Sequence, residues 1–407
     1  MIKFDFKTYV KQFINEEQFN YLYAKKTDLI DLLKKSGDIG WTKKVDKTVI
    51  DDIKNTAKYI KKNYDCLVVI GIGGSFLGSY AFENIFKSYF DDMNYPIIYA
   101  GTTLSSKYLD ELIKHLQNKN FCINVISKSG STMETIITYK LLKDLLKRKY
   151  SEEEVKNRII ISTNKETGFL REEANVNHYK SFDLPDDIGG RYSFITAAHL
   201  LPLALNFNID EIVEGYEDGK KLIDVAFEYA VIRRLLFEQK KVVENFCIEE
   251  ENMSYFTEWL KQLFGESEGK KGLGILPIST LYTRDLHSLG QLIQDGNKII
   301  FETFIRVTNS NNFVEYNKEE LHRINNLVLD SVMRAHYKGS VPCLEIEITE
   351  IDIESISSLI YFFMLSAAFS ASLFGVYPFN QPGVEIYKEE VRKALNWNEW
   401  KKIISQS

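Results

Sequence analysis

The feature that most constrains the fold is a repeated order of short apolar runs and helical segments. In the first half of the chain, each of four apolar runs is followed by sequence with the spacing of a helix. These runs lie at residues 66–70, 96–100, 121–126 and 158–162. Such alternation is typical of a parallel sheet that is covered by helices on both faces.

The second half of the chain repeats this pattern after a polar, acidic stretch at 206–220. Its apolar runs lie at 272–278, 298–305 and 344–348. A length of 407 residues also favours more than one domain. We therefore predict an α/β fold with two three-layer αβα domains and mainly parallel sheets. The predicted parts are an N-terminal helical segment at 1–45, a first domain at 46–205, a second domain at 206–375 and a C-terminal helical tail at 376–407.

Charge and cysteine content exclude several classes of protein. The net charge is −6 and no basic patch is visible, which argues against a nucleic-acid partner. The four cysteines are widely separated and form no CxxC pair, so neither a zinc site nor a disulfide framework is predicted. The first residues do not have the pattern of a signal peptide. These features predict a protein of the reducing cytoplasm.

Residues 355–384 contain no charged side chain and are long enough to cross a bilayer. The stretch nevertheless includes several serines, Gly375, Pro378 and Pro382. Acidic residues, Glu354 and Glu385, flank it where a membrane span favours lysine or arginine. We therefore predict a buried helix packed between domains and no contact with a membrane.

A hydroxyl-rich segment, Ser127–Thr135, follows the apolar run at 121–126. It holds five hydroxyl side chains and one ammonium group within nine residues. Ser131 and Glu134 have the spacing of a capping box, which predicts a helix start near Thr132. A helix N-terminus offers free N–H groups and partial positive charge to a phosphate. The segment therefore predicts a site for a phosphorylated small molecule.

A glycine-rich loop at 71–78 follows another buried run. The dinucleotide-binding pattern requires a small residue where Phe76 stands, and the P-loop requires lysine where Ser79 stands. A purely structural turn remains an alternative. The carboxyl end of a strand in an open α/β sheet is, however, where ligands bind. We expect Gly74 to let a substrate approach the backbone and Ser75 to donate a hydrogen bond to it.

The two loops together resemble those of the sugar isomerase (SIS) domain. The first reads Gly-Ile-Gly-Gly-Ser at 71–75, and the second reads Ser-Lys-Ser-Gly-Ser-Thr-Met-Glu-Thr at 127–135. Both fit the SIS pattern without a gap, and the second is the more specific. This resemblance implies two SIS-type domains that bind a phosphosugar. It does not by itself imply catalysis, because some SIS domains are regulators.

Four further segments each have an ordinary structural explanation when taken alone. The acids at 266–268 fit a solvated helix end, His287 a surface or core histidine, Arg191 a solvated side chain in a glycine turn, and Lys388 an exposed lysine. Together with the two loops, these segments resemble one family, glucose-6-phosphate isomerase, in its compact bacterial form. Its six signature segments occur in order, near 72 and at 127, 189, 266, 287 and 381.

The family resemblance implies catalytic roles for four residues. Glu266 would be the base that moves a proton between C2 and C1 of the sugar. His287 would open the sugar ring, with Lys388 assisting it. Arg191 would face the enediolate as negative charge develops there. These roles imply an intramolecular aldose–ketose isomerase of glycolysis and gluconeogenesis.

The same resemblance implies a set of substrate-binding residues and the partners of the chain. The binding residues would be Gly74, Ser75, Ser127, Lys128, Ser129, Thr132 and Gln262. The scheme needs no metal and no cofactor. It implies a homodimer in which His287 is shared across the interface.

Two departures from the wider family concern residues without a chemical role. Glu268 stands where longer members usually have asparagine, and Asn380 stands where aspartate often precedes the glutamine. Two alternatives to an isomerase remain. A phosphosugar sensor would need the phosphate loop and no base, and a nucleotide-dependent enzyme would use the glycine loop.

Overall fold

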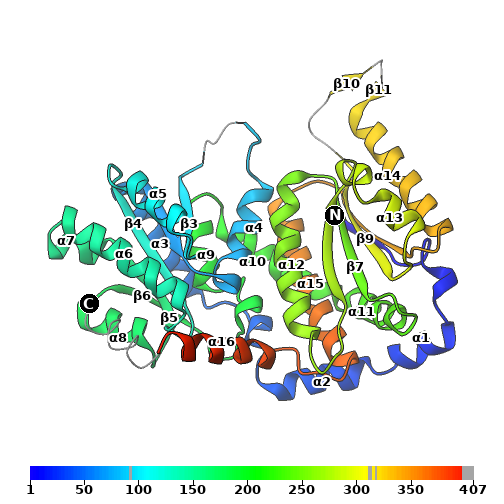
Figure 1. Cartoon of the computed structure of the whole chain (residues 1–407), viewed down its shortest axis with the longest axis horizontal. Helices are drawn as coiled ribbons and strands as arrows, with labels where there is room; N and C mark the ends of the chain where they lie inside the picture. Colours follow the sequence, from blue (N-terminus) through cyan, green and yellow to red (C-terminus); the bar gives the residue numbers. More distant parts are fainter. Residues whose placement is uncertain (91–93, 310–313, 317–318, 397–407) are drawn as a thin grey trace. The chain divides into compact units, whose positions relative to one another are not determined.

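The computed structural model describes residues 1–90, 94–309, 314–316 and 319–396. The chain divides into two compact units, and each unit is assembled from three segments (Figure 1). Unit 1 comprises Met1–Asp46, Leu77–Met93 and Phe207–Pro378. Unit 2 comprises Lys47–Phe76, Asn94–Asn206 and Phe379–Ser407. Each unit contains a five-stranded sheet with helices, so the predicted α/β class with mainly parallel sheets is confirmed.

The sheet of unit 2 is parallel throughout, with the strand order β3-β2-β4-β5-β6. Its strands are β2 (Cys66–Ile70), β3 (Ile97–Ala100), β4 (Phe121–Ser127), β5 (Ile159–Asn164) and β6 (Lys180–Leu184). The first four match the predicted runs. Strands β2 and β4 are buried along their whole length, which explains their continuous apolar sequence. The edge strand β6 was not predicted, because its sequence alternates polar and apolar side chains.

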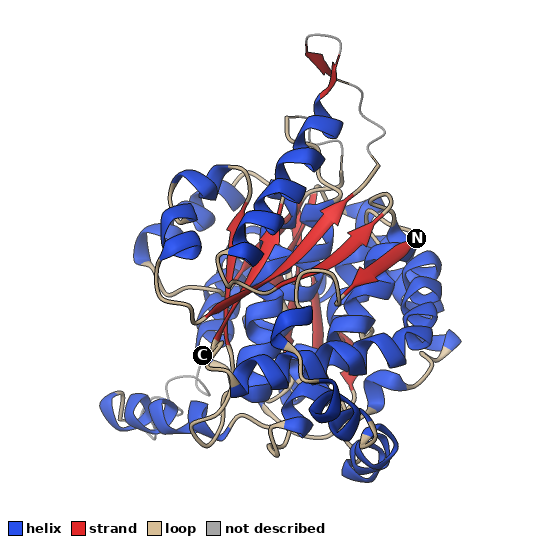
Figure 2. Ribbon diagram, turned by 90° about the vertical axis from the view of Figure 1, so that its right-hand side faces the viewer, coloured by secondary structure: helices blue, strands red, loops and turns tan. Residues whose placement is uncertain are grey.

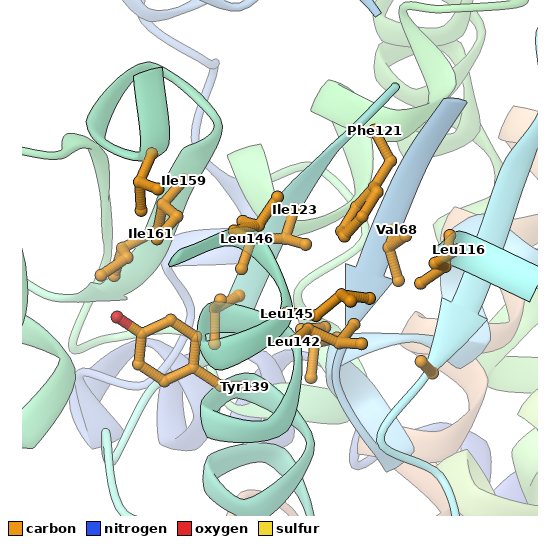
Figure 3. Packing of buried hydrophobic residues seen from close by; sticks show 14 of the residues in the cluster. Val68, Leu116, Phe121, Ile123, Tyr139, Leu142, Leu145, Leu146, Ile159 and Ile161 are labelled. Atoms are coloured by element: carbon orange, nitrogen blue, oxygen red, sulfur yellow. The ribbon is translucent and has the colours of Figure 1, made fainter. Parts of the chain in front are cut away.

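Helix α6 (Met133–Lys149) covers one face of this sheet and fills its core. The buried side chains of Leu142 and Leu146 lie close to those of Ile123 and Val68 on the strands (Figure 3). The other helices of the unit are α3 (Lys47–Asn63), α5 (Ser106–Leu116), α7 (Glu152–Asn157), α8 (Phe169–Asn177), α9 (Ala197–Leu203) and α16 (Pro382–Ala394). This packing positions the N-terminus of α6 beside the carboxyl end of β4.

The sheet of unit 1 has the order β1-β12-β9-β7-β8, and only β1 runs antiparallel to its neighbour (Figure 2). Its strands are β1 (Ile2–Asp5), β7 (Val243–Ile248), β8 (Leu276–Leu281), β9 (Ile300–Val307) and β12 (Cys343–Ile348). The prediction that 1–45 is helical is wrong at its start, because β1 pairs with β12. Strand β7 was also missed, because it carries the polar residues Glu244 and Asn245.

The apolar stretch forms helix α15 (Ile353–Leu373), which is the core helix of unit 1. Its most apolar window is 83% buried, so the predicted burial is confirmed, but its main packing partners lie within one unit and not in two domains as predicted. Its packing partners α10 (Ile209–Asp218), α11 (Ile223–Glu238) and α12 (Ser254–Glu268) all belong to unit 1. Because these neighbours supply the apolar environment, the helix resembles a core helix rather than a membrane span.

The two units group the chain differently from the predicted domains. Helix α4 (Leu77–Ile85), predicted to belong to the first domain, contacts α12 and lies in unit 1. There the ring centroids of Tyr80 and Tyr255 are 4.3 Å apart. The N-terminal segment also belongs to unit 1. Apolar periodicity predicts that a segment is helical, but it carries no information about which core the helix joins.

Candidate functional site

The hydroxyl groups of the serine-rich loop converge at the end of β4. Oγ of Ser127 lies 3.1 Å from Oγ1 of Thr132 and 3.5 Å from Oγ of Ser129. The hydroxyl of Ser131 donates to Oγ of Ser129 over 3.3 Å. Gly130 allows this tight turn because its φ of +64° is unfavourable for other residues. We call the four hydroxyl residues, Ser127, Ser129, Ser131 and Thr132, the hydroxyl cluster.

Helix α6 begins directly after the hydroxyl cluster, at Met133, with Thr132 as its N-cap. The predicted start is therefore confirmed within one residue, but the predicted capping box between Ser131 and Glu134 is wrong. The N-cap residue is Thr132, and its side chain makes no capping hydrogen bond. Its hydroxyl is turned toward Ser127 instead. The first turn of the helix is thus left without a side-chain cap, which suits an anion.

The glycine loop forms a short helical turn, η3 (Gly73–Ser75), after β2. A Cβ atom on Gly74 would lie 2.2 Å from the carbonyl carbon of Gly190 and 2.7 Å from the nitrogen of Arg191. The close approach expected from a substrate is therefore made by the backbone of the protein itself. Glycine is required at 74 because η3 packs directly against η4 (Gly190–Tyr192).

Arg191 is a buried side chain, with 3% of its surface exposed. Its Nη1 donates to Oε1 of Gln381 over 3.0 Å, and its Nη2 donates to the carbonyl oxygen of Asn380 over 3.1 Å. The alternative of a solvated arginine is therefore wrong. Residues 380–381 directly precede α16, which carries Lys388. The ammonium of Lys388 donates to Glu385 over 2.8 Å, and the side chain is half-exposed.

Lys128 supports the loop that leads into η4. Its Nζ donates to the carbonyl oxygens of Asp186 and Ile188, over 2.7 and 3.0 Å. It also lines a small cavity in unit 2. The cavity is lined by Ser75, Lys128, Leu184, Pro185, Ile188, Gly190, Ser193, Thr196 and Ala198. The structure thus brings the glycine loop, Lys128 and the Arg191 turn together within unit 2.

In unit 1, helix α12 carries Gln262 and Glu266 one turn apart. Nε2 of Gln262 donates to Oε1 of Glu266 over 3.3 Å. Both side chains are half-buried. Within the described part of the chain, the buried Oε1 of Gln262 has no hydrogen-bond partner. The last turn of α12 therefore presents a carboxylate beside an open acceptor.

The end of α12 is held by a buried ionic cluster that the sequence did not reveal. Glu268 is fully buried and pairs with Arg233 of α11, whose Nε also donates to Glu244 over 2.8 Å. Burial raises the pKa of Glu268, although the Arg233 guanidinium opposes this shift. Two sequence features could have revealed this cluster: Arg233 among the apolar residues of α11, and Glu244 within β7. Glu268 is thus an internal anchor rather than part of a solvated helix end.

His287 ends a short turn, η7 (Arg284–His287), and its side chain is exposed. Within unit 1, His287 is therefore a surface histidine. The turn follows Tyr282, whose hydroxyl donates to the buried carboxylate of Glu302 over 2.6 Å. Nδ1 of His336 lies 2.6 Å from the same carboxylate. Burial opposes ionisation of Glu302, but these hydrogen bonds hold its pKa below the ordinary value.

The predicted site residues divide between the two units. Unit 1 carries Gln262, Glu266 and His287. Unit 2 carries Gly74, Ser75, Ser127, Lys128, Ser129, Thr132, Arg191 and Lys388. Most of these residues lie on loops or helix ends, where side chains can reach a ligand, whereas Gln262 and Lys388 lie within helices.

Comparison with known proteins agrees with this architecture. Two αβα units, one with a hydroxyl cluster at a helix N-terminus, define an α/β protein of the sugar isomerase type. A structure of a hypothetical protein from Thermus thermophilus has a TM-score of 0.84, with 23% identity, covering 97% of this chain and 100% of that chain. A glucose-6-phosphate isomerase from Chlamydia trachomatis has a TM-score of 0.80, with 18% identity, covering 95% of this chain and 87% of that chain. These likenesses concern the fold.

Sequence similarity identifies the family. The model of the phosphoglucose isomerase family matches residues 42–235. A glucose-6-phosphate isomerase of Staphylococcus epidermidis is 40% identical, over 86% of this chain and 84% of that protein. Another, from Streptococcus equi subsp. zooepidemicus, is 38% identical over 97% of this chain and 96% of that protein. The chain belongs to the phosphoglucose isomerase family, as its motifs predicted.

Proposed function

We propose that the protein interconverts D-glucose 6-phosphate and D-fructose 6-phosphate by ring opening and enediol proton transfer. Two observations in a member of this family support the proposal: unit 2 has a cluster of hydroxyl groups at a helix start, and unit 1 has a carboxylate on α12 that is oriented by a neighbouring glutamine. The reaction belongs to glycolysis and gluconeogenesis. The protein would act in the cytoplasm, and its substrate would be a small phosphosugar.

The phosphate group would bind at the hydroxyl cluster. Ser127, Ser129 and Thr132 supply short donors, and the uncapped first turn of α6 supplies N–H groups and partial positive charge. Lys128 would support the phosphate site indirectly, because its ammonium already donates hydrogen bonds to the carbonyl oxygens of Asp186 and Ile188. Anchoring the phosphate at a distance from the reacting carbons orients the sugar for reaction.

Glu266 would transfer the proton between C2 and C1. Its carboxylate is half-buried and is oriented by Gln262 through one oxygen, which suits a group that must take a proton and return it. The Gln262 amide would hydrogen-bond a sugar hydroxyl, since an amide can both donate and accept. The buried ion pair of Glu268 and Arg233 holds the end of α12. It therefore fixes the backbone position from which the Glu266 side chain extends.

Arg191 would stabilise the enediolate. A buried guanidinium is always charged, and its position is fixed by Gln381 and the carbonyl of Asn380. A fixed cation costs no reorganisation when negative charge develops on the substrate. Ser75, on η3 beside this turn, would line the sugar, and Gly74 would let η3 pack closely against η4 behind it.

His287 would open the sugar ring with help from Lys388. Its exposure on unit 1 suits a histidine that completes the site of a second copy of the chain, so the functional unit would be a homodimer. The scheme uses proton transfer alone and calls for no metal or cofactor. A sensor without turnover is the alternative, but such a protein has no use for the Glu266, His287 and Lys388 set.

The test of this function is a coupled assay that follows conversion of fructose 6-phosphate to glucose 6-phosphate with a chelator present. The proposal expects sustained turnover that the chelator does not reduce. Binding of fructose 6-phosphate without turnover would support the sensor and contradict the proposal. Thermal protection by a nucleotide and none by phosphosugars would support a nucleotide-dependent enzyme instead.

A further inference from the structure

His199 is a fully buried histidine that the proposed mechanism does not use. It lies on α9, a few residues after Ser193 and Arg191. Its Nε2 is 2.8 Å from the carbonyl oxygen of Gly74 and 3.2 Å from Oγ of Ser193. A buried imidazole in direct contact with the glycine loop is therefore part of the support of this loop.

The chemistry of the contact determines the tautomer of His199. The carbonyl oxygen of Gly74 can only accept, so Nε2 of the imidazole must carry the proton and donate it. Burial lowers the pKa of His199 to about 4, which keeps the ring neutral near pH 7. The histidine thus acts as a fixed hydrogen-bond donor and not as a titrating group near neutral pH.

Ser193 extends the same contact to the turn that carries Arg191. Its hydroxyl lies 2.7 Å from the carbonyl oxygen of Gly190 and 3.1 Å from the carbonyl oxygen of Gly74, and it can donate to either. Gly74 and Gly190 are themselves in backbone contact. Two side chains, His199 and Ser193, therefore join η3 to η4 at the point where the two turns meet.

We propose that His199 is a positioning residue, which sets the distance between the sugar-lining loop at 73–75 and the Arg191 turn through its hydrogen bond to Gly74. This inference rests on the proposed function, which places Ser75 and Arg191 at the substrate. Without the imidazole donor, the buried carbonyl of Gly74 would lose its closest partner, and η3 would shift relative to η4 to find another. The hydroxyl cluster lies on a different loop and would keep its geometry.

The test compares His199→Leu, which fills the space without a donor, with His199→Gln, whose side-chain amide can donate to Gly74. We expect kcat for fructose 6-phosphate to fall by roughly 10- to 100-fold in His199→Leu, the scale of a small displacement of reacting groups. The inhibition constant of inorganic phosphate, which probes the hydroxyl cluster, should not change. His199→Gln should recover most of kcat. A purely structural role would lower the melting temperature and leave kcat per folded molecule unchanged.

The inference is overturned if folded His199→Leu keeps the wild-type kcat, or if His199→Gln loses as much as His199→Leu. Should His199→Leu not fold, His199→Met, which also lacks a donor, replaces it, and unchanged kcat there would overturn the inference. Arg191→Ala distinguishes a failure of the proposed catalytic site from a failure of the positioning role of His199. Full activity of Arg191→Ala would contradict the proposed catalytic site itself, whereas an inactive Arg191→Ala with a fully active His199→Leu contradicts only the positioning role.

Discussion

Gln262 donates a hydrogen bond from Nε2 to Oε1 of Glu266, one turn later on α12, over 3.3 Å. The pair presents an oriented carboxylate next to a Gln262 amide oxygen that can still accept a hydrogen bond. Beside this pair, the buried Arg233 and Glu268 hold the end of the helix. Contacts within unit 1 therefore orient the candidate base before any substrate is considered.

The hydroxyl cluster predicts a loss of affinity when its members are changed. Ser127→Ala removes a group that contacts both Ser129 and Thr132, so KM for fructose 6-phosphate should rise by roughly tenfold, the value of one hydrogen bond to a charged group. Steady-state kinetics measures this. Ser151→Ala is the matched control, because it removes an N-cap of α7 in the same unit and should lower stability while leaving KM unchanged. A wild-type KM in Ser127→Ala would contradict the assignment.

Gly74→Ala is expected to damage both folding and activity. The new methyl group would lie 2.2 and 2.4 Å from the backbone carbon and oxygen of Gly190, and backbone cannot rotate away as a side chain can. We expect a loss of about 1–3 kcal/mol in the free energy of unfolding, as for overpacking in a core. Urea denaturation measures it.

Gly383→Ala is the control for this substitution, since among the described residues no atom beyond its chain neighbours and its own helix backbone lies within 4 Å of its Cβ position, and it occupies helix α16. It should be neutral or stabilising by about 0.5–1 kcal/mol. Equal stability of the two variants would mean that η3 and η4 do not make the close contact.

The buried cluster at the end of α12 predicts a large effect from a single substitution. Arg233→Met would leave Glu244 and Glu268 buried without their cation, which should cost about 3–5 kcal/mol of unfolding free energy. Adding Glu268→Gln should recover part of this loss. Arg234→Met is the matched control, because its partner Glu238 is partly exposed and the pair is worth at most about 1 kcal/mol. Similar losses in both single variants would contradict the account.

His199 predicts a pH dependence of stability with a definite sign. Burial lowers the pKa of this residue from 6.5 to about 4, so its native environment favours the neutral ring. The contribution is present above pH 6.5 and is lost as the pH falls toward 4, because the unfolded chain then binds the proton more tightly. Up to about 3 kcal/mol is involved. Denaturation of wild type and His199→Gln across this pH range measures it, and equal slopes would contradict the assignment.

Much of the fold was predictable because local chemistry determined it. The runs at 66–70 and 121–126 are buried on both faces, and their apolar sequence shows this directly. Strand β7 was missed for a different reason. Its polar residues Glu244 and Asn245 are buried with partners far along the chain, such as Thr303 and Glu302. Long-range pairing of this kind leaves no periodic pattern.

The candidate site was predictable to the same extent. The hydroxyl cluster follows from residue type and position alone, and the structure brings its members within hydrogen-bonding distance. The sequence alone did not predict why glycine stands at 74 or which groups Lys128 contacts. Gly74 meets Gly190, and Lys128 meets the carbonyls of Asp186 and Ile188, and both contacts depend on how distant loops pack.

The most direct test of the central claim is the turnover of fructose 6-phosphate by Glu266→Gln, measured together with its affinity for the sugar phosphate. Glu258→Gln, at an exposed position of the same helix where Glu258 pairs with Lys261, is the control and should behave as wild type. The account predicts that Glu266→Gln loses at least about 100-fold in kcat, the contribution of a general base, while the affinity changes by less than about tenfold. A Glu266→Gln protein with near wild-type kcat would contradict it.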